Sequence, residues 1–187
     1  MRPVWRPYAL MAGSLAFAGW VLPPVLLWVG FSDLLYRRIA NRLVLGLLVL
    51  WLIQLAWLGL QGSEALSWSG IARGVLAAAI VLIVGYGLFA MHWAGAGDVK
   101  LVAVLCLWMG NEVSAFLVVT SLAGGVLALG LPLLRRIERF LAARVSRLGT
   151  WLHRPLSTPL ALSSHTTPGI PYGFAIAAGA AFVLFHG

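Results

Sequence analysis

The sequence predicts an all-α protein: a polytopic membrane bundle of about six transmembrane helices with a basic amphipathic helix on the membrane surface. Hydrophobic residues make up 61% of the 187 residues and charged residues 10%, against averages of about 45–50% and about 25% in soluble domains. The mean hydropathy is +0.97. These figures exclude a soluble globular enzyme, a disordered chain and a fibrous protein. We expect one integral membrane domain over residues 1–187, with no separate soluble domain.

Six apolar runs account for the expected spans, and several have the ~20 residues that cross ~30 Å of hydrocarbon. The runs are 9–30, 43–60, 71–91, 99–110, 113–134 and 170–186. The first resembles a signal peptide but is about twice as long as the usual apolar region of one, so we interpret it as a retained span. The fourth gives only about 18 Å at ~1.5 Å per residue, so we expect its start, at Asp98, to lie inside the membrane. Alternatively, the fourth and fifth runs form one long helix through Asn111 and Glu112.

The positive charge lies between the apolar runs, which favours a lipid bilayer over nucleic acid as the partner of a chain with net charge +8. Segments 31–42, 92–100 and 135–169 hold ten of the 13 Lys and Arg residues. The positive-inside rule assigns these segments to the cytoplasm and both termini to the outside. Residues 135–154 combine helical apolar spacing with arginines, as expected of an amphipathic helix on anionic lipid. The single cysteine, Cys106, can form neither an internal disulfide nor a four-cysteine zinc site.

The chain has two aspartates, Asp33 and Asp98, and both stand at the edge of an apolar run on the same predicted side. An ionisable residue at membrane depth suggests function by default. If the first helix ends beside the start of the fourth, the two carboxyls face each other. One carboxylate can then take a proton from water while the other, protonated, polarises a scissile carbonyl. Such a pair shares one proton, because two like charges this close cannot both ionise.

Asp98 lies in the segment Gly95-Ala96-Gly97-Asp98-Val99-Lys100. We expect the two glycines to permit positive φ and to let an extended peptide backbone approach closely. The alternative is a tight turn in which Asp98 caps the fourth helix. The segment matches neither a phosphate-binding loop nor the dinucleotide fingerprint.

Three groups of residues together resemble the type IV prepilin peptidases, membrane aspartic proteases of the Gly-x-Gly-Asp class. They are Asp33 with Arg38-Ile39-x-Asn41, then Gly95-x-Gly97-Asp98-x-Lys100-Leu101, and Pro171-Tyr172-Gly173 before the last run. The resemblance extends from about residue 20 to residue 186. Two departures are Ala40, where the family has proline, and the bulky Met91-His92-Trp93 before the second motif.

The resemblance implies an aspartic endopeptidase of the bacterial cytoplasmic membrane, with Asp33 and Asp98 catalytic and with neither metal nor cofactor. Its partners would be the lipid bilayer and a prepilin, bound through its short basic leader peptide and apolar N-terminal helix and cut at the cytoplasmic face. Long members carry a domain with paired zinc-binding cysteines linked to N-methylation. This sequence lacks those cysteines, so it looks like the short type that serves Flp tight-adherence pili, without methyltransferase activity.

The other motif residues each have a functional and a structural interpretation. Lys100 either contacts substrate or extends to the membrane interface. Asn41 either hydrogen-bonds the turn that holds Asp33 or caps the second helix. Arg38 either shapes the site or lies among lipid headgroups. Pro171, Tyr172 and Gly173 either line the site or form the turn that starts the last helix.

The helix dipoles suggest different roles for the two aspartates. Asp98 starts a helix, where the dipole favours the anion by ~0.3–1 kcal/mol, and Asp33 follows a helix end. We therefore expect Asp98 to act as the ionised base and Asp33 as the protonated acid.

Competing classes fit less well. A metalloprotease would need His-Glu-x-x-His, which is absent, and the serine motif that Gly30-Phe31-Ser32 begins lacks its final glycine. The alternatives that stay open are a small ion-coupled transporter with buried aspartates and a secretion-assembly scaffold.

Overall fold

The computed structural model describes residues 6–36, 39–61, 67–130 and 172–186, with side chains from residue 18 onward. This part of the chain is helical, as predicted. Its helices are α1 (Arg6–Tyr36), α2 (Asn41–Gln61), α3 (Trp68–Ala90), α4 (Ala96–Met109), the 3₁₀-helix η2 (Gly110–Glu112), α5 (Val113–Leu129) and α7 (Tyr172–His186). Each apolar run contributes one α-helix. The predicted amphipathic helix at 135–154, Arg38 and Pro171 lie outside the described residues.

The prediction of six spans is not reproduced. Within the described residues, four stretches are long and apolar enough to cross a membrane, and the apolar helix α7 is shorter. The four stretches are Ala18–Tyr36, Asn41–Leu60, Trp68–Ala90 and Ala96–Leu129. The number of candidate spans is lower than predicted for two reasons. The helices α4, η2 and α5 form one apolar stretch, and α7 has only 15 residues, a length of about 22 Å.

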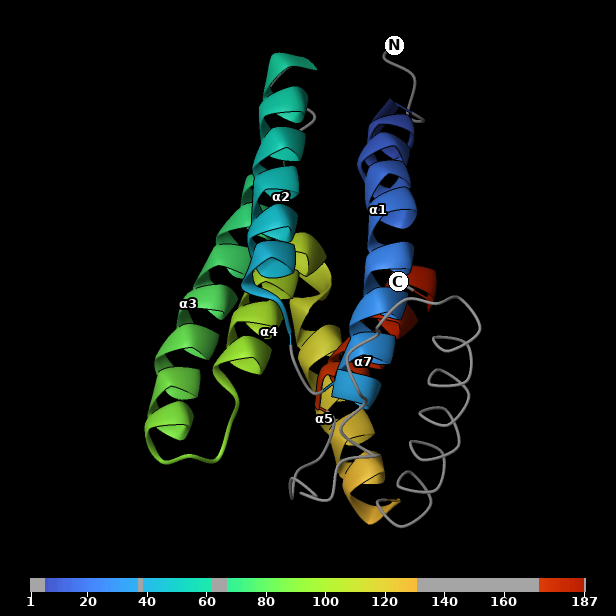
Figure 1. Cartoon of the computed structure of the whole chain (residues 1–187). Coiled ribbons are helices and arrows are strands. Elements are labelled where there is room, and N and C mark those ends of the chain that lie inside the picture. Colours follow the sequence, from blue (N-terminus) through green and yellow to red (C-terminus); the bar gives the residue numbers. More distant parts are fainter. Residues whose placement is uncertain (1–5, 37–38, 62–66, 131–171, 187) are drawn as a thin grey trace, which may run out of the picture.

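The chain nevertheless breaks its α-helix between α4 and α5. Gly110 has φ 52° and ψ −109°, a conformation that favours glycine. A Cβ at Gly110 would lie 3.6 Å from the carbonyl oxygen of Gly70, so the turn also packs closely on α3. Beyond this turn α5 runs back toward the end from which α4 came (Figure 1). The fourth and fifth runs are therefore two helices joined by a turn.

The helices form two groups that meet along α4 and α7 (Figure 1). In one group α3 runs antiparallel to α4, with Gly74 against the backbone of Cys106. The same group includes α2, which contacts α4 through a hydrogen bond of 3.1 Å from Trp108 Nε1 to the Leu47 carbonyl. In the other group α7 packs antiparallel to both α1 and α5, with Gly179 against the Thr120 backbone at 2.9 Å. Small residues at these crossings let the helices approach closely, as is usual in membranes.

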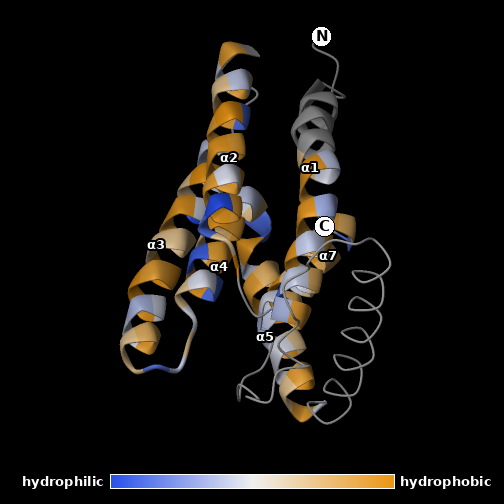
Figure 2. Ribbon diagram, viewed as in Figure 1, coloured by the Kyte–Doolittle hydropathy of each residue, from blue (hydrophilic) through white to orange (hydrophobic). Residues whose placement is uncertain are grey.

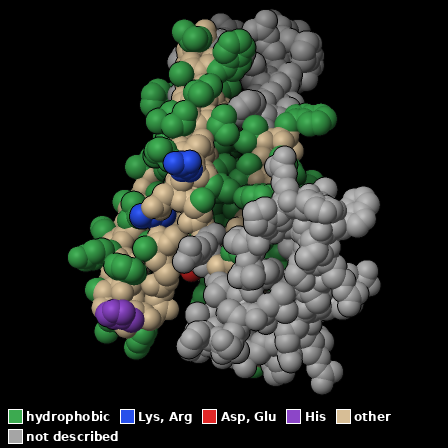
Figure 3. Space-filling view, viewed as in Figure 1, with side chains coloured by type: hydrophobic (Ala, Val, Ile, Leu, Met, Phe, Trp, Pro, Cys, Tyr) green, Lys and Arg blue, Asp and Glu red, His purple; other side chains and the backbone are tan. Residues whose placement is uncertain are grey.

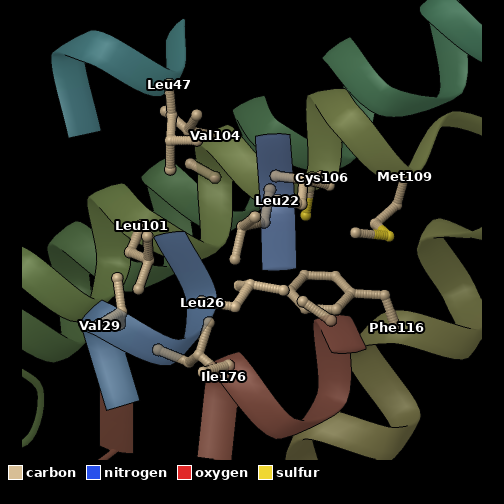
Figure 4. Packing of buried hydrophobic residues seen from close by; sticks show 14 of the residues in the cluster. Leu22, Leu26, Val29, Leu47, Leu101, Val104, Cys106, Met109, Phe116 and Ile176 are labelled. Carbon is tan, nitrogen blue, oxygen red and sulfur yellow. The ribbon is translucent and has the colours of Figure 1, made fainter. Parts of the chain in front are cut away.

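The core lies where the two groups meet. Figure 4 shows Leu22 and Leu26 of α1, Phe116 of α5 and Ile176 of α7 packed together, with Leu101 of α4 beside them. The residues of α2 and α3 are mostly hydrophobic (Figure 2). Large apolar side chains cover much of the outside of these helices (Figure 3). An exposed apolar surface of this extent is what a lipid-facing bundle requires and what a soluble monomer avoids.

Candidate active site

Asp33 lies in the last turn of α1, three residues before the helix ends at Tyr36. The sequence placed it after the first helix, and that boundary was wrong, because α1 continues through Phe31-Ser32-Asp33 without a helix-breaking residue. The side chain is 5% exposed and is the one buried charged side chain in the described part of the chain. A buried carboxyl in a membrane helix is expensive, so its position indicates a function.

Asp98 lies in the first turn of α4 and is half-buried. The residue at the N-cap is Gly95, with φ −77° and ψ 136°, and no side chain caps the helix. The interpretation of Asp98 as a capping residue was therefore wrong. The unpaired N–H groups of this first turn still favour an acidic side chain at Asp98.

The structure brings the two aspartates to the same end of the bundle, one from each group of helices. The two carboxyls are close enough to interact electrostatically, so they are neighbours at this end. Two contacts hold this end together: Gly97 packs on Ile39 in the segment between α1 and α2, and Gly173 packs directly on Asp33. The arrangement places two carboxyls at the seam between α1, α4 and α7.

Three glycines near the two carboxyls stand where a side chain would make close contacts. A Cβ at Gly95 would lie 2.8 Å from Asp98 Oδ2, and one at Gly97 would lie 3.2 Å from Ile39 Cβ. A Cβ at Gly173 would lie 2.8 Å from Asp33 Cγ. The motif glycines do not use the positive φ that they permit, since Gly110 is the one glycine with positive φ among the described residues. Space, and not backbone conformation, explains these three glycines.

A model of the type IV leader peptidase family matches residues 20–129. The chain belongs to the type IV leader peptidase family. It is accordingly an aspartic prepilin peptidase, a hydrolase in a multi-pass membrane protein, and its family activity is the removal of prepilin leader peptides. Comparison with curated proteins and with solved structures gives no match. The family match contains Asp33 and Asp98 but ends before α7.

Two polar motif residues of the peptidase pair with each other. Lys100 Nζ donates a hydrogen bond of 3.3 Å to Asn41 Oδ1, so the fifth residue of α4 is tied to the first residue of α2. Both side chains are exposed. This bond joins the two motifs, and neither of the two interpretations of Lys100 from the sequence anticipated it.

Of the last motif, Tyr172 and Gly173 lie in the described residues, at the start of α7. Tyr172 packs on α5, where a Cβ at Gly124 would lie 3.5 Å from its ring, and Gly173 is buried against Asp33. Among the described residues no group of three or more His, Cys, Asp and Glu side chains could hold a metal ion.

Sequence reasoning missed Gly85 of α3 and its neighbour Val99. A Cβ at Gly85 would overlap the Val99 side chain, with Val99 Cγ2 at 2.8 Å and Cβ at 3.1 Å. Gly85 therefore makes room for the residue that follows Asp98. A glycine in the middle of an apolar run was the available signal, since glycine weakens a helix unless packing requires it.

Proposed function

We propose that this prepilin peptidase removes the short basic leader from Flp-type prepilins at the cytoplasmic face of the membrane, with Asp33 and Asp98 as its catalytic pair. The observation that carries the proposal is the convergence of these two carboxyls, from α1 and α4, at one end of the bundle. No other pair of acidic residues converges within the described part of the chain, because its third acid, Glu112, lies at the far end of α4.

The proposed reaction is direct attack by water on the peptide bond after the leader. Asp98 takes a proton from water as the oxygen attacks the carbonyl carbon, and Asp33 gives its proton to the carbonyl oxygen. Return of a proton to the nitrogen then releases the amine of the mature pilin and the carboxyl of the leader. Asp98 is half-buried in the first turn of α4 and so is the carboxyl that water reaches, whereas Asp33 is buried at the end of α1. These positions support Asp98 as base and Asp33 as acid.

The remaining motif residues would shape the site and the path of the peptide. We assign Gly95, Gly97 and Gly173 to the walls around the carboxyls, and the Lys100–Asn41 pair to the joint between α2 and α4. Arg38, Pro171 and Tyr172 keep the role in substrate binding or site shape that the motifs suggest.

The Flp-type substrate and the orientation rest on the sequence. The single cysteine of the chain, Cys106, is buried in α4, so the paired zinc-binding cysteines of the long members are not in this sequence. The segments 31–42 and 92–100, which flank the two aspartates, carry Arg37, Arg38, Arg42 and Lys100. This charge supports a cytoplasmic position for the aspartate end and an outside position for both termini.

The test of the function is cleavage of a purified Flp-type prepilin by the peptidase in proteoliposomes, followed by mass spectrometry of the products. The wild type should release the leader at one bond, and Asp33→Asn and Asp98→Asn should each lose at least ~100-fold in rate. Glu112→Gln is the matched control, because it removes an exposed carboxylate at the other end of α4 and should leave the rate unchanged. An aspartate variant that cleaves at the wild-type rate would refute the catalytic pair, and exclusive cleavage of other prepilin types would refute the substrate.

The orientation of the protein in the membrane can be tested separately, because exposed residues near the two ends of α4 can be labelled chemically. His92, beside the aspartate end, and Asn111, at the opposite end, can each be replaced by cysteine while Cys106 stays buried. In intact spheroplasts an impermeant maleimide should label Asn111→Cys and not His92→Cys. The reverse labelling pattern would place the aspartates outside.

A further inference from the structure

The first turn of α7 lies directly against Asp33. A Cβ at Gly173 would lie 2.8 Å from Asp33 Cγ, 2.9 Å from its Cβ and 2.9 Å from its Oδ2. Both residues are buried. The contact thus includes Asp33 Cβ, whose position is fixed by the α1 backbone, as well as the carboxyl group, whose position depends on rotation. Nothing in the family match assigns this contact, because that match ends at residue 129.

We propose that Gly173 is a positioning residue for Asp33, and that the first turn of α7 is the wall that holds the Asp33 carboxyl opposite Asp98. The proposal rests on the proposed function of the two aspartates. Gly173 has no side chain to offer a substrate, and it acts through Asp33. The last helix is then part of the catalytic centre although its residues carry no reacting group.

α7 cannot easily move away from Asp33, because it is packed on both sides. On α1, a Cβ at Gly30 would lie 3.4 Å from the Phe174 ring and 3.8 Å from Ala177 Cβ. On α5, Gly179 lies against the Thr120 backbone, where a Cβ would be 2.9 Å from both the Thr120 Cα and N atoms. Because Asp33 Cβ is fixed by the α1 backbone, a side chain at residue 173 displaces the last turn of α1 together with the Asp33 carboxyl.

The displacement is large enough to affect catalysis. Ordinary van der Waals contacts of a Cβ begin at about 3.4 Å, so an alanine Cβ at residue 173 requires Asp33 Cγ to withdraw by about 0.6 Å. A misplacement of about 1 Å in a catalytic group lowers rates by about 100-fold. Gly173→Ala should accordingly lower kcat about 10- to 100-fold. KM should stay within about twofold, since the peptide contacts are not changed.

The kinetic experiment compares Gly173→Ala with Gly125→Ala in the full-length peptidase, with Flp-type prepilin as substrate. Gly125 lies on α5 next to the glycine that Tyr172 covers, and a Cβ there meets nothing within 4 Å. Gly125→Ala should keep the wild-type kcat and KM. A wild-type kcat for Gly173→Ala would overturn the proposal.

A second measurement separates positioning from substrate contact and covers the case in which Gly173→Ala folds poorly. Asp33→Ala removes Cγ and Oδ2, two of the three atoms that a Cβ at Gly173 would meet. In that background, Gly173→Ala should lower the melting temperature less than it does in the wild type, and prepilin affinity should not change. Equal losses of melting temperature in the two backgrounds would refute the contact, and weaker prepilin binding would instead assign Gly173 to the peptide path.

Failure of this inference can be distinguished from failure of the proposed function. If the wild type does not cleave prepilin, or if Asp33→Asn cleaves it, the function itself is wrong. If both of those results are as expected and Gly173→Ala retains full kcat, only the positioning role is wrong.

Discussion

The contact between Gly85 and Val99 fixes the distance between α3 and the turn that carries Asp98, so filling it should destabilise the protein. In Gly85→Ala the new Cβ overlaps the Val99 side chain, with Val99 Cγ2 at 2.8 Å and Cβ at 3.1 Å. Overpacking of this kind lowers the free energy of unfolding by about 1–3 kcal/mol, while the higher helix propensity of alanine raises it by about 1 kcal/mol. We expect a net loss of up to about 2 kcal/mol.

The double variant Gly85→Ala with Val99→Ala should recover most of that loss. Removing both Cγ atoms of Val99 leaves only the contact with Cβ at 3.1 Å, which a shift of a few tenths of an ångström relieves. The two substitutions should thus be non-additive by about 1–2 kcal/mol in the favourable direction. For a chain of this size, that corresponds to about 2–8 °C in melting temperature.

The assay is thermal unfolding of the purified variants in one detergent, read together with prepilin cleavage. Gly87→Ala is the matched control, because it lies on the same helix and a Cβ there meets nothing within 4 Å. It should raise the melting temperature slightly through helix propensity. Since Val99 follows Asp98, Gly85→Ala should also lower kcat, and the double variant should restore part of it. Additive melting temperatures would refute the close approach of α3 to α4.

Other contacts near the site give separate predictions. Asn41→Ala and Lys100→Met should each lower kcat by a similar factor, and the double variant should be no worse than either, because the two side chains form one hydrogen bond. If the double variant instead lost cleavage rate by the product of the two single losses, the pairing of Asn41 and Lys100 would be contradicted. Gly95→Ala should lower kcat without lowering the melting temperature, since its Cβ would meet only the end of the rotatable Asp98 side chain. His92→Gly should raise the stability by about 1 kcal/mol in thermal unfolding, because His92 has φ 62° after α3; a lower melting temperature would show that the histidine side chain contributes more than its backbone costs.

Most of the helices could be predicted from the sequence because hydrocarbon thickness sets the length of an apolar run. The runs 43–60 and 71–91 became α2 (Asn41–Gln61) and α3 (Trp68–Ala90), with ends within a few residues. The first run was placed at 9–30, but α1 continues to Tyr36. The polar residues at the end of this run continue the helix, because nothing in Phe31-Ser32-Asp33 prevents a further helical turn.

The pairing of the two aspartates was an expectation from chemistry, and its geometry could not be derived from the sequence. Charge and hydropathy indicate that Asp33 and Asp98 share a side of the membrane. They do not show that α7 supplies the wall behind Asp33, because that contact joins residues that are distant in the chain. The role of the motif glycines could not be derived from the sequence for the same reason, because it depends on contacts with distant parts of the chain. A sequence shows where glycine stands, but whether it serves conformation or space depends on which atoms of another helix lie beside it.

That Asp98 lies inside the membrane stays a prediction from the short fourth run, whereas its position along α3 follows from the contacts between the helices. α4 has 14 residues, about 21 Å, and pairs antiparallel with the 23 residues of α3. Val99 meets Gly85, five residues before α3 ends at Ala90, so Val99 lies about 8 Å inside that end of α3 and Asp98 about 6 Å inside it. A carboxyl inside a helix bundle is expensive, and α1 brings Asp33 to the same end of the bundle because its own last turn remains helical. The extension of α1 to Tyr36 and the position of α4 along α3 thus both keep the two carboxyls within helices of the bundle and not in loops beyond it.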